Sequence, residues 1–74
     1  MQTTIKKVYS SDSFIMFEVN VPATPNQTFA EAKSAANSFA KSIVETPQGF
    51  RHDSTVFHRG NSFHTVELHY KLAF

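Results

Sequence analysis

The sequence predicts an α+β fold with the element order β-β-α-β-β, in which one helix packs on one face of a four-stranded, mainly antiparallel sheet. Three observations predict it. Apolar residues alternate with polar ones at both ends of the chain, a helical apolar stripe lies between them, and turn-forming residues separate the segments. With 74 residues, the chain is expected to form a single domain over residues 1–74.

The N-terminal part predicts a β-hairpin. Residues 3–9, TTIKKVY, are β-prone and amphipathic, and the SSDS segment that follows is typical of a turn. The second strand covers residues 13–21 and ends at Pro22, because proline cannot donate a hydrogen bond to a ladder.

The middle of the chain predicts an amphipathic helix. Thr28 and Glu31 have the spacing of a capping box, in which each side chain accepts a hydrogen bond from the other residue's backbone N–H. An apolar stripe follows at spacings of three and four, and the helix is expected to end before Pro47. The stripe comprises Phe29, Ala32, Ala36, Phe39 and Ile43, and the polar side comprises Glu31, Ser34, Asn37, Ser38, Lys41 and Glu45.

A second hairpin is predicted from residues 51–58 and 63–74, joined through Gly60 and Asn61. The last strand alternates cleanly, with Val66, Leu68, Tyr70, Leu72 and Phe74 on one face. Placing the two longest apolar strands in the centre gives the strand order 1-2-4-3, in which all neighbours are antiparallel and strands one and three are the edges.

The second strand carries apolar residues on both faces. Ile15, Phe17 and Val19 match the helix stripe, which leaves Phe14 and Met16 on the opposite, open face. One helix covers only one face of a small sheet, so the open face is expected to bind a partner. The alternative is that singly exposed apolar residues are ordinary, or that the tail or the proline-rich linker covers them.

The register of the second hairpin decides which residues join this open face. A two-residue loop pairs Phe57 with His64 on the helix side, whereas a three-residue loop pairs Phe57 with Phe63 on the open side. In the first register His52 and His69 are direct neighbours and His58 faces Phe63. The candidate interaction face comprises Phe14, Met16, His52, Val56, His58, Phe63 and His69.

The histidines suggest two kinds of chemistry, and neither is expected. His52 and His69 could share a metal ion with Glu67 or Asp53, but their spacing matches no established ligand pattern. His52 with Asp53, or His69 with Glu67, could serve as an acid–base pair. No nucleophile motif or phosphate-binding loop accompanies them, so we predict a non-enzymatic protein without a cofactor or bound metal.

The composition limits which binding partners and which cellular compartment we expect for this protein. The net charge is only +1, which gives little attraction for nucleic acid, and no apolar run is long enough to span a membrane. Cysteine is absent and no secretion signal precedes the first strand, so the cytoplasm is the expected location.

The predicted function is a protein-interaction module that uses the open face or a sheet edge, either to form a homodimer or to bind a host protein. The layout is similar to that of many small bacterial and phage-encoded proteins, some of which bind and inhibit host machinery. The alternative is a single-stranded nucleic-acid-binding module. It would use Phe14 and Phe63 for stacking, with the basic residues Lys6, Lys7, Arg51, Arg59 and Lys71.

Facing histidines would also predict a pH response. If His52 and His69 were cross-strand neighbours, their protonation would place like charges side by side. Stability and self-association would then both decrease as the pH falls through about 6.5.

Overall fold

The computed structural model describes residues 3–73 and confirms the predicted α+β fold. The strands are β1 (Thr4–Ser10), β2 (Phe14–Pro22), β3 (Phe50–His58) and β4 (Phe63–Leu72), and the helix is α1 (Phe29–Ile43). All neighbouring strands are antiparallel in the order β1-β2-β4-β3, as the sequence predicts. Phe74, which was predicted to continue the last strand, lies outside the described residues.

The helix begins at the predicted capping box. The Thr28 hydroxyl oxygen accepts from the Glu31 N–H at 3.2 Å, and the Glu31 carboxylate accepts from the Thr28 N–H at 2.9 Å. These bonds hold the pKa of Glu31 below its ordinary value, because the Thr28 backbone and side chain favour the charged carboxylate. The box therefore fixes where α1 starts and how the linker enters it.

The buried side of α1 is narrower than the predicted stripe. Only alanines are fully buried, at Ala32, Ala36 and Ala40, whereas Phe29 and Phe39 lie at the margins and are about half exposed. Small side chains let the helix approach the sheet closely. Asn37, predicted to face solvent, is half-buried, and its Oδ1 has no hydrogen-bond partner within the described residues.

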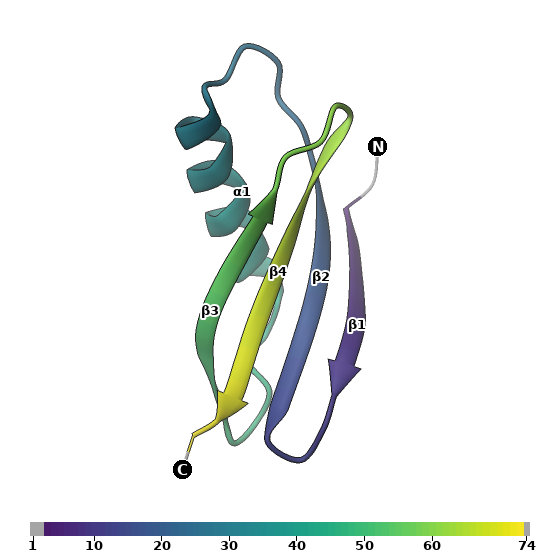
Figure 1. Cartoon of the computed structure of the whole chain (residues 1–74), viewed down its shortest axis with the longest axis vertical. Helices are drawn as coiled ribbons and strands as arrows, with labels where there is room; N and C mark the ends of the chain where they lie inside the picture. The colour runs from purple at the N-terminus through teal and green to yellow at the C-terminus, as the bar shows by residue number, and fades with distance from the viewer. Residues whose placement is uncertain (1–2, 74) are drawn as a thin grey trace.

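The core lies between α1 and the two central strands. Val19, Val66 and Leu68 are fully buried there, and partly buried aromatic side chains from β2 and β3 pack around them. Figure 1 shows α1 behind β3 and β4, while β1 lies at the opposite edge of the sheet. The helix packs against β2, β3 and β4, and all residues of β1 are exposed.

Neither predicted register of the second hairpin is correct. Phe57 pairs with Val66, rather than with His64 or Phe63, because the connection between β3 and β4 is longer than two or three residues. A β-bulge between His52 and Ser54 then shifts the pairing, so that His52 faces Tyr70 and Ser54 faces His69. Because a one-residue shift moves a side chain to the other face, the bulge places His52 on the helix side.

Candidate functional site

The predicted interaction face is divided by the observed register. Phe14 pairs with Lys71 at one end of the β2–β4 ladder, and Phe63 pairs with Pro22 at the other. Glu18 and Glu67 face each other between these ends. The apolar residues of the open face are therefore spread along the sheet, with Phe14 at one end, Val56 beside Glu67 and Phe63 at the other end, and do not form the single patch that the sequence predicts.

Aromatic rings gather at the Phe14 end. The ring centroid of Phe14 lies 5.6 Å from that of Tyr9 and 5.6 Å from that of His69, with interplanar angles of 55° and 51°. Met16 is opposite both Tyr9 and His69 in the strand ladders. Three of the predicted face residues thus come together here, and Tyr9 joins them from β1.

His58 and His69 meet at the carboxylate of Glu67. The Nε2 atom of His58 lies 2.7 Å from one carboxylate oxygen, and the Nε2 atom of His69 lies 3.2 Å from the other. Contact with His58, reinforced by His69, lowers the pKa of Glu67 below its ordinary value, although partial burial opposes this shift. Val56 pairs with Glu67 across the β3–β4 ladder and is exposed.

His52 does not belong to this surface. Its Nε2 atom lies 2.7 Å from the Thr55 hydroxyl, and its ring packs edge-on against Tyr70 at 5.6 Å, on the helix side of the sheet. The predicted pair of His52 and His69 is therefore wrong, and the pH response based on their mutual repulsion loses its geometric basis. Among residues 3–73, no group of three His, Cys, Asp or Glu side chains is placed to hold a metal ion.

The β1 edge is the most open part of the sheet. All seven of its residues are exposed, including the large apolar side chains of Ile5, Val8 and Tyr9. The two lysines at its centre, Lys6 and Lys7, make no ion pair with any other described residue. The sequence predicts that this strand is an edge, but it gives no sign that α1 leaves it uncovered.

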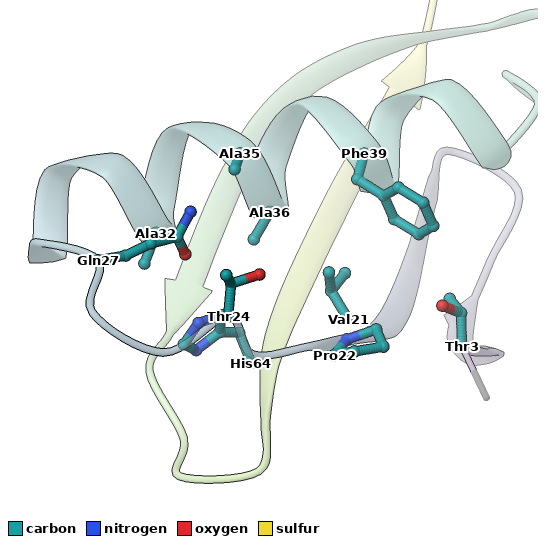
Figure 2. A pocket seen from close by; sticks show the side chains of 10 residues that line it. All are labelled: Thr3, Val21, Pro22, Thr24, Gln27, Ala32, Ala35, Ala36, Phe39 and His64. Carbon is teal, nitrogen blue, oxygen red and sulfur yellow. The ribbon is translucent and has the colours of Figure 1, made fainter. Parts of the chain in front are cut away.

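A cavity of about 330 Å³ lies between α1 and the ends of β1 and β2. Figure 2 shows Phe39 and Thr3 at one end of it, and Thr24, Gln27 and His64 at the other. Its middle is formed by Val21, Pro22, Ala32, Ala35 and Ala36. Sequence reasoning missed this cavity, because only the lateral position of the helix on the sheet creates it.

His64 also borders a second, polar cavity of about 250 Å³. The residues shared by the two cavities are Thr24, Ala32 and His64, and the polar cavity is completed by the linker and by the loop before β4. In that loop, the Arg59 guanidinium donates a hydrogen bond to the Gln27 carbonyl at 3.2 Å, which connects the loop to the linker.

Comparison with known proteins gives no further guide to the site. No protein family matches the chain, and neither a curated protein nor a solved structure is found to be similar to it. Within residues 3–73, no helix has the length and apolar character needed to cross a membrane.

Proposed function

We propose that this chain is a small, non-enzymatic protein-interaction module that binds an extended segment of a partner protein along β1. The observation that carries the proposal is that every residue of β1 is exposed, at the edge of the sheet away from the strands on which α1 packs. An edge strand presents unpaired backbone N–H and C=O groups, and a partner strand can satisfy them.

The side chains of β1 suit such a partner strand on both faces. Ile5 pairs with Val19 and therefore points to the helix side, whereas Tyr9 pairs with Met16 on the open side. Both are about half exposed. An added strand could bury apolar side chains against each of them, which would stabilise the complex beyond the backbone hydrogen bonds.

The lysines favour a partner protein over a second copy of this chain. Two copies of this chain could form one continuous sheet if their β1 strands paired antiparallel, centre to centre, with the open faces on the same side. In such a pairing, Lys6 would lie opposite Lys6 of the other copy, or Lys7 would lie opposite Lys7. Like charges directly opposite each other destabilise a sheet, and edge lysines commonly prevent self-pairing. An acidic segment would reverse this effect, so we assign the edge to an acidic partner strand.

The proposal includes the absence of catalysis and a cytoplasmic location. The described residues that line the two cavities include a histidine but no carboxylate or thiol that could act with it. A chain without cysteine has no disulfide that an oxidising compartment would be needed to form. A host protein with an exposed acidic segment would be a suitable partner.

The experiment uses two fluorescent heptapeptides, one of alternating glutamate and valine and one of alternating lysine and valine. Fluorescence anisotropy should show binding of the acidic peptide and none of the basic one. In the double variant Lys6→Glu and Lys7→Glu, we expect affinity for the acidic peptide to decrease by about tenfold or more, and the basic peptide to bind.

The matched control is the double variant Lys33→Glu and Lys41→Glu, which makes the same change in net charge on exposed positions of α1. It should retain the affinity of the unmodified protein. An equal loss in both double variants, or no binding of the acidic peptide, would contradict the proposal. Sedimentation at micromolar concentration should show a monomer, and a dimer would identify a second copy as the occupant instead.

Single-stranded nucleic acid remains a second candidate because of one observation. Tyr9, Phe14 and His69 form a row of rings at the end of the open face where Arg51 and Lys71 pair across the ladder. Bases can stack on such rings while the cations contact phosphates. Lys71 also lies 3.6 Å from Asp53, which offsets part of its charge.

This second candidate has its own test. A fluorescent thymidine 20-mer at low salt should bind through the aromatic row, and Phe14→Ala should weaken that binding. Phe63→Ala is the matched control, because Phe63 lies at the far end of the ladder. Lack of binding at low salt, or equal weakening by both variants, would remove nucleic acid from consideration.

A further inference from the structure

The buried imidazole of His64 is incompletely hydrogen-bonded. The residue is only 4 % exposed, and its Nε2 atom has no partner among the described residues. The Gly60 N–H donates to Nδ1 at 3.2 Å. Since Nδ1 accepts this bond, the neutral ring carries its proton on Nε2, which is therefore a buried donor without an acceptor.

The backbone around His64 makes this arrangement specific. A Cβ atom at Gly60 would collide with the Phe63 carbonyl oxygen, so only glycine allows the turn that brings the Gly60 N–H to Nδ1. The ring of Phe57 packs against the imidazole at 5.1 Å and restricts its orientation. Buried donors are normally paired, and His64 lines the cavity beside α1, so an acceptor that enters this cavity would complete the pairing.

From these observations we infer that the cavity between α1 and β2 binds a small monocarboxylate with an apolar tail, whose carboxylate accepts a hydrogen bond from His64 Nε2. The walls suit this ligand class, since Val21, Pro22 and the helix alanines provide an apolar surface for the tail. His64 and Thr24 lie together at one end (Figure 2), which gives the polar group a fixed position.

Charge favours a carboxylate over a neutral acceptor. The second cavity, which shares His64 and Thr24, is also lined by Arg59, so a permanent cation lines the space next to the polar end of the first cavity. Among residues 3–73, no aspartate or glutamate lines either cavity. The volume of about 330 Å³ is at the small end of ligand pockets, which suits a tail of a few carbon atoms.

This inference does not depend on the proposed partner strand, because the ligand would lie between the layers and not along the β1 edge. Hexanoate is a suitable probe, with hexanamide as the neutral acceptor and hexylamine as the probe without an acceptor. Imidazole ¹⁵N resonances of His64 should first identify the Nε2–H tautomer. Hexanoate should then shift them in a saturable manner, hexanamide should bind more weakly, and hexylamine should not bind.

Two variants separate the ligand site from folding. His64→Phe removes the donor and should lower hexanoate affinity by about tenfold or more. Because that change also deprives Gly60 of its acceptor, Ala35→Phe provides a second test: this exposed residue lines the cavity, and a ring there would block it. Ser34→Phe is the matched control, since Ser34 is exposed but does not line the cavity.

The result that supports the inference is loss of hexanoate binding in Ala35→Phe and retention in Ser34→Phe. The inference would be overturned by the absence of any response of the His64 resonances to hexanoate, by equal binding in Ala35→Phe and the unmodified protein, or by equal affinity for hexanoate and hexylamine. The inference would also be overturned if the His64 Nε2–H were bonded to a buried water molecule and hexanoate did not displace that water.

Discussion

The two edges of the sheet are equally peripheral in the strand order and yet differ in how they are covered. The β3 edge lies beside α1, and its Phe50 and Phe57 pack against the core, with Phe57 in edge-to-face contact with Phe29 at 5.5 Å. The β1 edge lies away from the strands on which α1 packs, and all its residues are exposed. The difference teaches that one helix can protect only one edge of a four-stranded sheet.

The two edge strands also differ in their side-chain contacts on the open face of the sheet. His58 of β3 contacts Glu67 of β4 at 2.7 Å, so a side-chain bond joins that edge to the centre of the sheet. On the other side, Lys6 of β1 lies opposite Glu18 of β2 without forming an ion pair. The β3 edge is therefore held on both faces, whereas β1 is held by its backbone ladder and, at one end, by the contact between the Tyr9 and Phe14 rings.

The largest effect should come from removing the aromatic contact of β3. Phe57→Ala should lower the free energy of unfolding by about 2 kcal/mol, roughly half the cost at a fully buried site, because Phe57 is only half-buried. Ile5→Ala, the matched change on β1, should cost less than about 1 kcal/mol. Urea denaturation measures both, and equal losses would show that the two edges are packed alike.

The sequence predicts the strands and the helix, but it does not predict that the helix packs near one edge strand and not the other. The period-two pattern of residues 63–72 and the capping box at Thr28 are local signals, and both elements form where they are predicted. An apolar stripe shows which side of a helix is buried, but it does not show which strands the helix lies over. The exposure of β1 could therefore not be predicted from the stripe.

The candidate site was predictable only in part, for a related reason. Phe14, Met16 and His69 lie together because uninterrupted alternation in β2 and β4 fixes their face. His52 was misplaced because a bulge shifts the pairing between His52 and Ser54, and RHDSTVFH contains no glycine that would mark it. The cavity beside His64 arises from the helix position and has no local sequence signal.

A smaller effect should come from weakening the helix that covers β3. Thr28→Ala removes one half of the capping box and should destabilise the protein by about 1 kcal/mol. Because α1 packs more against β3 than against β1, amide hydrogen exchange should accelerate more in β3 than in β1. Equal acceleration in both edge strands would show that the helix supports them equally.

The smallest effect concerns pH and the Glu67 contact that ties β3 to β4. The pKa of Glu67 in the folded chain lies below its ordinary value of 4.5, so the unfolded chain takes up the proton first as the solution becomes acidic. Glu67 therefore contributes its full stabilisation when the pH is above the ordinary value of 4.5. This stabilisation is lost as the pH falls from that value through the lower pKa of the folded chain. Glu67→Gln should remove this part of the acid sensitivity.

Urea denaturation near pH ~6 and near pH ~3 tests this contribution. The unmodified protein should lose more stability between the two conditions than Glu67→Gln does. Glu18→Gln is the matched control, since Glu18 faces Glu67 across the ladder but contacts neither His58 nor His69. Identical losses in the unmodified protein and Glu67→Gln would show that the Glu67 carboxylate does not help to hold β3 against β4.

The central claim is that β1, and not β3, is the edge at which a partner strand adds. The most direct measurement is paramagnetic broadening of backbone amide signals by a spin-labelled glutamate–valine heptapeptide. We predict that the signals of Thr4–Ser10 broaden first, while those of Phe50–His58 remain sharp at the same peptide concentration. Broadening centred on β3, or spread equally over both edges and the open face, would contradict the claim.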